Sequence, residues 1–82
     1  MKRESFTVAG YEFELDKGTV ERKLTRRHPE KVRVAYVHIH RQDFPVTQVL
    51  AESVPGLVRS RIKTQEAVRV LAKLGFTIRE KR

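Results

Sequence analysis

The sequence predicts a single α+β domain in which a mainly antiparallel sheet of three to four strands packs on two to three helices. The chain has 82 residues, 39% of them hydrophobic and 34% charged, which suffices for one small apolar core. Some short segments alternate apolar and polar residues, as half-buried strands do, whereas others carry apolar residues at helical spacing. The chain has no internal repeat and no linker. We therefore expect one domain over residues 1–82, with residues 1–5 and 80–82 free.

The first predicted element is a half-buried strand over residues 6–15, with the sequence FTVAGYEFEL. Tyr11, Phe13 and Leu15 alternate with glutamates, so they predict the buried side of this strand. Gly10 interrupts the run, and a glycine inside a strand is typical of a bulge or of a close backbone approach.

A short helix is expected next, over residues 16–27. Asp16 is placed to act as its N-cap, and Val20 and Leu24 lie four residues apart on the side that would face inward. The alternative is a hairpin whose glycine-containing loop leads into a second arm at residues 19–24. The wealth of helix-forming residues favours the helix.

Residues 32–40, with the sequence VRVAYVHIH, form the clearest strand pattern in the chain. Its two halves have apolar residues of opposite phase, and this change of phase near Ala35 predicts a β-bulge. A turn at residues 41–42 would then lead into a short return strand at residues 43–44.

Two helices and a short strand are expected in the remaining sequence. The first helix covers residues 45–53 and begins at a proline, which is favoured at a helix start. The second covers residues 64–74, with Thr64 as N-cap and Gly75 as a left-handed C-cap, before a strand at residues 76–79. The predicted inward side of the second helix consists of Ala67, Val68, Leu71 and Leu74.

Basic residues outnumber acidic ones by 18 to 10, which gives the chain a formal net charge of +8. Between residues 53 and 79 there are six basic residues and one acid, Glu66, so this segment alone carries +5 (6 − 1). Charges of one sign on ordered elements repel each other, so such a surface predicts a polyanionic partner.

The helix at residues 64–74 places Gln65, Arg69 and Lys73 four residues apart, which predicts one outward stripe. Arginine and glutamine are the side chains that read guanine and adenine edges, and lysine neutralises phosphate. The preceding turn adds further cations beside the helix start, where backbone N–H groups also favour phosphate. The predicted nucleic-acid-binding residues are Arg59, Arg61, Lys63, Gln65, Arg69, Lys73 and, at an earlier turn, Arg41.

Residues 44–79 resemble a winged helix-turn-helix domain, because a short helix, a turn (VPGLVRSRIK), a basic amphipathic helix and a strand follow one another. The turn is longer than the usual three or four residues. The resemblance implies that DNA is the partner ahead of RNA, and that the protein is a small regulator, a mobile-element protein or an antitoxin. A homodimer is a further expectation, because a single small reader gains affinity when two copies bind paired half-sites.

A second resemblance keeps RNA binding as an alternative. The run AVRVLAKLGFTIREKR is similar to the helix–strand start of double-stranded-RNA-binding toxins of the HicA type. In those proteins a Gly-Ser-His segment that carries the chemistry comes after the strand, whereas the histidines of this chain lie before it. The resemblance therefore implies an RNA-binding fold without that nuclease.

No catalytic residue, metal site or cofactor is expected. His38 and His40 share one face of the predicted strand, but a zinc site needs three or four ligands and no further ligand is suitably spaced. The chain lacks cysteine, a phosphate-binding glycine loop, a signal peptide and a membrane-spanning apolar run, so we expect a cytoplasmic protein with no membrane partner. The competing function is a protein-interaction module whose basic face docks an acidic partner protein.

Overall fold

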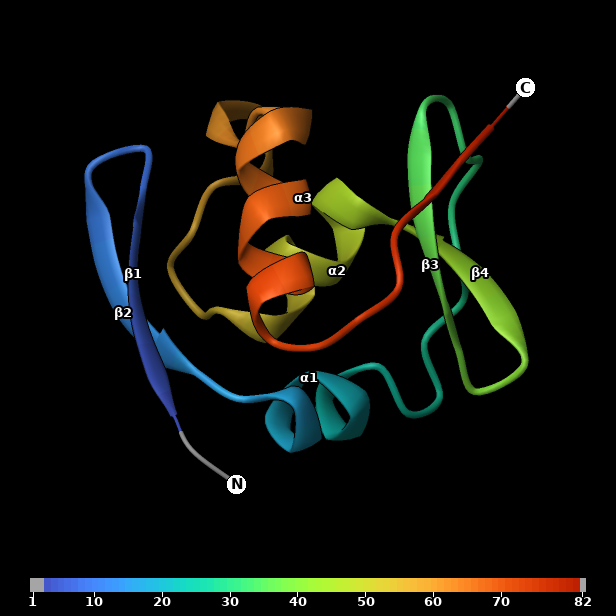
Figure 1. Ribbon diagram of the computed structural model, residues 1–82, viewed down its shortest axis with the longest axis horizontal. Helices are drawn as coiled ribbons and strands as arrows, with labels where there is room; N and C mark the ends of the chain where they lie inside the picture. Colours follow the sequence, from blue (N-terminus) through green and yellow to red (C-terminus); the bar gives the residue numbers. More distant parts are fainter. Residues whose placement is uncertain (1–2, 82) are drawn as a thin grey trace.

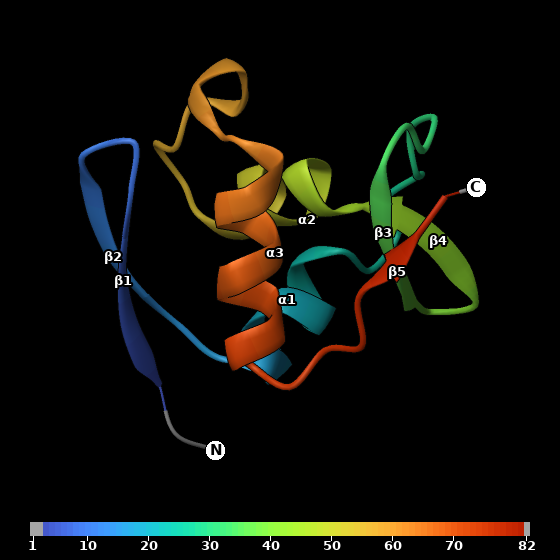
Figure 2. The same ribbon diagram turned by 45° about the horizontal axis from the view of Figure 1, so that its top comes forward.

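The computed structural model describes residues 3–81. Within this range, two antiparallel sheets and three α-helices form one small α+β domain, which confirms the predicted fold class (Figures 1 and 2). The strands belong to two separate sheets, whereas the sequence predicts one. A two-stranded hairpin and a three-stranded sheet lie on opposite sides of the helix α3 (Figure 1). No helix in the described range has the length and apolar character that crossing a membrane requires.

The first hairpin pairs β1 (Glu4–Val8) with β2 (Tyr11–Leu15). Ala9 and Gly10 connect the strands with φ angles of 53° and 77°, both in the left-handed region that two-residue hairpin turns use. The prediction of one continuous strand with a bulge at Gly10 is therefore wrong, because the chain reverses direction there.

The hairpin has an apolar side and a polar side. Phe6 and Phe13 face each other across the strands with their ring centroids 5.8 Å apart, and the Tyr11 hydroxyl donates a hydrogen bond to the Pro55 carbonyl oxygen at 3.0 Å. Val8 on this side is buried. The opposite side is fully polar and exposed, and it consists of Ser5, Thr7, Glu12 and Glu14.

The helix α1 (Lys17–Lys23) follows the hairpin, so the predicted helix is confirmed and the alternative hairpin is wrong. Asp16 is its N-cap, and a carboxylate oxygen of Asp16 accepts a hydrogen bond from the Thr19 N–H at 2.7 Å. This backbone hydrogen bond, aided by the Thr19 side chain and by Arg3, holds the pKa of the Asp16 carboxyl below its usual value. Val20 is buried, as predicted, but the helix ends at Lys23 and does not continue to residue 27.

The second sheet has the strand order β4-β3-β5, with β3 (Ala35–Ile39) between β4 (Gln42–Pro45) and β5 (Arg79–Glu80). The predicted return strand is confirmed. The predicted bulge near Ala35 is wrong, because the strand begins at this residue and the preceding valines lie outside it. His40 and Arg41 form the β3–β4 turn with φ angles of 52° and 65°.

The helices α2 (Val46–Ser53) and α3 (Thr64–Lys73) confirm the two predicted C-terminal helices, and the short 3-10 helix η1 (Arg59–Arg61) lies between them. Thr64 is not the N-cap of α3. Lys63 occupies that position, and it makes no side-chain capping hydrogen bond.

The inward side of α3 is slightly rotated from the predicted one. Ala67, Val70 and Leu71 are fully buried, whereas Val68 and Leu74 are only partly buried at the flanks. Gly75 has a φ of 103°, and its N–H donates to the Ala72 carbonyl while the Phe76 N–H donates to the Leu71 carbonyl. This pair of hydrogen bonds is a Schellman motif, which confirms the predicted glycine C-cap.

The final strand is β5 at residues 79–80 and not at residues 76–79. Glu4 and Ser5 of β1 pair with β2, and Glu80 of β5 pairs with β3. These residues of the two segments that were expected to be free therefore take part in sheets. Residues 1, 2 and 82 of those segments lie outside the described residues.

Candidate nucleic-acid interface

Six of the seven predicted binding residues lie on one continuous segment formed by η1 and α3. Arg59 and Arg61 are the ends of η1, and Lys63 is the N-cap of α3. All six side chains are exposed to solvent. We call this surface the basic face, and it consists of Arg59, Arg61, Lys63, Gln65, Arg69 and Lys73.

The geometry of α3 explains why three of these side chains share one direction. Residues four apart lie one above the other on a helix, so Gln65, Arg69 and Lys73 form a stripe on the side opposite the buried Leu71. The burial of the apolar side against α2 fixes the rotation of the helix about its axis. The same packing therefore directs the stripe to solvent.

The charges of the basic face are largely uncompensated. Glu66 is the only acid between residues 59 and 73, and it is half-buried in the first turn of α3. Within residues 3–81, Arg59 is the member of the face that forms an ion pair, and its partner is Glu30. Exposed cations without counter-ions repel each other, and an approaching polyanion would relieve this repulsion.

Arg41 does not belong to this surface. It lies in the β3–β4 turn, which both views place on the far side of the molecule from the first turn of α3 (Figures 1 and 2). Its backbone takes a left-handed conformation as part of that turn. The sequence predicted a binding role for Arg41, and the structure does not bring it together with the other six residues.

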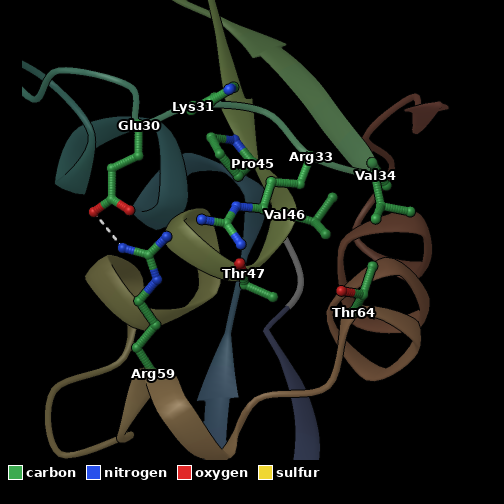
Figure 3. Close-up of a pocket in the computed structure, with 10 residues that line it drawn as sticks. Glu30, Lys31, Arg33, Val34, Pro45, Val46, Thr47, Arg59 and Thr64 are labelled. Atoms are coloured by element: carbon green, nitrogen blue, oxygen red, sulfur yellow. Dashed lines mark ion pairs between the residues drawn. The ribbon is translucent and has the colours of Figure 1, made fainter. Parts of the chain in front are cut away.

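A pocket of about 360 Å³ lies beside the basic face, where the loop before β3, the start of α2 and the η1–α3 segment meet (Figure 3). Lys31 and Arg33 come from the loop, Thr47 from the first turn of α2, and Arg59 and Thr64 from the η1–α3 segment. The pocket therefore joins Arg59 to two cations that are remote in the sequence.

Gln48 holds the loop of this pocket in place. Its side chain is 3% exposed, and its amide oxygen accepts a hydrogen bond from the Glu30 N–H at 2.8 Å. The amide nitrogen donates to the His28 carbonyl oxygen at 2.8 Å and to a Glu52 carboxylate oxygen at 2.7 Å. These contacts tie residues 28–30 to α2, so the cations that follow start from a fixed backbone position.

The histidines have separate partners. His38 Nδ1 lies 2.7 Å from a carboxylate oxygen of Asp43 on the neighbouring strand, and His40 Nε2 donates to the Glu21 carbonyl oxygen at 2.6 Å. Among residues 3–81, no group of three or more histidine, aspartate or glutamate side chains is arranged to hold a metal ion. His38 therefore contributes a contact within the β3–β4 hairpin, whereas His40 connects the turn of this hairpin to α1.

Lys31, Arg33 and Thr47 line the pocket although the sequence did not predict them as site residues. Lys31 and Arg33 flank a valine in an alternating run, which is also the pattern of a solvated strand face. What makes them site residues is that the segment before β3 lies beside the start of α2 and η1, and a single sequence carries no local signal for this contact.

The chain belongs to the SCO5918-like family, whose pattern it matches over residues 5–82. No curated protein and no solved structure matches the chain. The family match includes the basic face and the residues of the pocket.

Proposed function

We propose that this chain is a non-enzymatic, cytoplasmic nucleic-acid-binding protein that contacts DNA, ahead of RNA, through the basic face. The observation that carries the proposal is the exposure of five cations along η1 and α3 with a single, half-buried acid among them. A face that serves only solubility usually mixes charges of both signs. A face of one sign favours the phosphate backbone.

The arrangement of the face also supports DNA as the preferred partner. The α3 helix has ten residues and presents Gln65 and Arg69 on its exposed side, and a major groove admits an α-helix whose side chains reach base edges. Lys63 and Arg61 precede the helix, where they can contact phosphate. In this proposal the protein acts as a small regulator, and a homodimer would place two such helices on paired half-sites.

Binding assays with duplex DNA, single strands and structured RNA test the proposal. Arg69→Ala should weaken binding to the preferred sequence by about 1–3 kcal/mol and reduce discrimination between sequences. Lys63→Ala should instead weaken all sequences alike and lower the slope of log K against log salt by about one. Arg22→Ala and Lys23→Ala are the matched controls, because both residues are exposed on α1, and they should change binding far less.

Two results would contradict the proposal. The first is an absence of binding to any DNA or RNA at about 100 mM salt, where non-specific binders are still detectable near micromolar concentration. An acidic partner protein would then be the better explanation of the basic face. The second is a loss of binding in the α1 controls together with full binding by Arg69→Ala, since the contact surface would then lie elsewhere.

A further inference from the structure

The pocket beside the basic face concentrates positive charge in a recess. Its lining contains three cations, Lys31, Arg33 and Arg59, and one acid, Glu30. Arg59 and Glu30 form an ion pair, so Lys31 and Arg33 are left without an ion-pair partner among residues 3–81. The volume of about 360 Å³ is within the range of roughly 300–1,000 Å³ that small-ligand sites occupy.

The side chains converge in a way that suits an oxyanion. Arg33 and Arg59 extend toward the same part of the recess from the loop and from η1, and Thr47 lines this recess from the first turn of α2 (Figure 3). The Thr64 hydroxyl faces the recess from the opposite wall, while Lys31 lies at the rim (Figure 3). Two guanidinium groups that approach each other repel, and an anion between them removes this repulsion.

We propose that this pocket binds the phosphate group of a phosphomonoester. Arginine presents paired N–H donors that match phosphate oxygens in a bidentate manner, and the two threonine hydroxyls supply further donors. The helices α2 and α3 also begin at the pocket, and the partial positive charge of their first turns adds to the field of the side chains.

The shape of the site favours a monoester over a phosphodiester. A terminal phosphate carries a charge of about −1.5 to −2 and three terminal oxygens, so it can engage several donors in a recess. A phosphodiester carries one charge and continues in both directions, so it suits an open groove. The apolar residues Val34, Pro45 and Val46 line the same pocket, and they can contact the carbon skeleton that bears the phosphate.

Glu30 would compete with the phosphate group for the Arg59 guanidinium. Its side chain is 52% exposed, and its carboxylate forms the ion pair that neutralises Arg59. An exposed ion pair of this kind contributes little free energy, so a dianion can replace the carboxylate at Arg59. Removal of the Glu30 charge should therefore strengthen phosphate binding, whereas removal of either arginine should weaken it.

Titration of the full chain with inorganic phosphate, followed by amide chemical shifts, tests the proposal. Saturable shifts should centre on Thr47 and Thr64 and exceed those caused by chloride at equal ionic strength. Arg33→Gln and Arg59→Gln should each weaken phosphate binding at least tenfold, and Glu30→Gln should strengthen it several-fold. Lys23→Gln on α1 removes one charge elsewhere and should leave the affinity unchanged.

The same titration distinguishes the source of the phosphate. A nucleoside 5′-monophosphate represents a free metabolite, and a short oligonucleotide with or without a 5′-phosphate represents a nucleic-acid end. A 5′-phosphate that tightens oligonucleotide binding tenfold, with the gain lost in Arg33→Gln, assigns the pocket to nucleic-acid ends. A mononucleotide that binds while the 5′-phosphate has no effect assigns it to a free metabolite.

This inference does not depend on the basic face binding nucleic acid. Arg69→Gln should leave phosphate affinity unchanged, so loss of DNA binding in this variant and loss of phosphate binding in Arg33→Gln are separate results. Phosphate shifts that do not saturate, or that stay the same in both Arg33→Gln and Arg59→Gln, would overturn the proposal. Unchanged thermal unfolding of the variants without phosphate shows that the pocket residues were altered without loss of the fold.

Discussion

The two hairpins use the same backbone turn with different residues. Ala9-Gly10 connects β1 to β2 and His40-Arg41 connects β3 to β4, and all four residues have φ angles between 52° and 77°. A non-glycine residue in this region costs about 1–2 kcal/mol. The first turn contains one glycine and the second contains none. The second turn is held from outside by the hydrogen bond from His40 to the Glu21 carbonyl oxygen.

The hairpins also differ in the burial of their side chains. Val37 and Phe44 of the β3–β4 hairpin are at most 1% exposed, and β4 leads directly into α2. The β1–β2 hairpin is a separate two-stranded sheet that buries Val8 and Leu15. Between them the apolar side is less covered, since Phe13 is only partly buried and Tyr11, which the sequence predicted to be buried, is 42% exposed. The β3–β4 hairpin can tolerate two non-glycine residues in its turn because a third strand, the buried Phe44 and the His40 hydrogen bond fix its register. The β1–β2 hairpin pairs with no further strand in the described range, and a glycine relieves one of its two turn positions.

The difference in burial predicts the largest effect. Phe44→Ala in β4 should lower the free energy of unfolding by about 3–5 kcal/mol, because a fully buried ring leaves a cavity. For a domain of this size that is a large part of the total stability. Phe13→Ala in β2 should cost less than half as much, since this ring is only half-buried. Urea unfolding measures both values.

Equal losses for the two phenylalanine variants would contradict the difference in burial between the hairpins. The β1–β2 hairpin would then be as much a part of the core as the β3–β4 hairpin. A small loss for Phe44→Ala alone would mean that the three-stranded sheet rearranges to fill the cavity.

The same comparison shows which parts of the fold the sequence could predict. The α2 and α3 helices and the Gly75 cap follow from local signals, namely helical periodicity and a glycine after the last turn. The first hairpin was missed because Ala9-Gly10 is not one of the strong turn pairs such as Asn-Gly. A usable signal was present, since the apolar phase changes from Val8 to Tyr11 across two residues.

The candidate site was predictable only where it is local in sequence. The basic face lies on one helix and the turn before it, so helical periodicity placed Gln65, Arg69 and Lys73 together. The pocket brings Arg33 and Arg59 together through a tertiary crossing of the segment before β3 past α2, where Gln48 accepts a hydrogen bond from the Glu30 N–H. Such a crossing depends on packing, and packing cannot be read from the spacing of residues.

The turns predict a second, smaller pair of effects with opposite signs. Gly10→Ala should destabilise the protein by about 1 kcal/mol, because alanine disfavours a φ of 77° while open space surrounds the new methyl group. Arg41→Gly should stabilise it by up to about 1 kcal/mol, because glycine removes the cost of the left-handed conformation. The gain is limited because glycine loses more chain entropy on folding. Thermal unfolding measures both.

A control separates the turn backbone from the contact that holds it. His40→Gly removes the same left-handed cost and also removes the hydrogen bond to α1, so it should stabilise less than Arg41→Gly. If His40→Gly stabilises more, the hydrogen bond contributes nothing and the account of the second turn is wrong. Arg41→Gly should also leave nucleic-acid binding intact, because Arg41 lies away from the basic face.

The smallest effect concerns the junction between the first hairpin and α1. Asp16→Asn keeps an N-cap acceptor for the Thr19 N–H but removes the charge that Arg3 and the helix start favour. The hydrogen bond from Thr19 lowers the pKa of Asp16 in the folded state, so its charge stabilises the protein above the unfolded pKa of about 3.9. This contribution is lost as the pH falls through the lowered pKa. Wild type should therefore exceed Asp16→Asn in stability at pH 7, and the two should converge at lower pH.

Urea unfolding of both proteins at pH 7 and at pH 2 to 3 decides this point, with Asp16→Ala as the variant that lacks a cap at every pH. Asp16→Ala should remain the least stable of the three proteins across the whole range, because alanine offers the Thr19 N–H no acceptor. A constant difference between wild type and Asp16→Asn from pH 7 down to pH 2 would contradict a charge effect. The capping of α1 would then rest on hydrogen-bond geometry alone, and the first hairpin would be joined to the helical part of the domain without help from electrostatics.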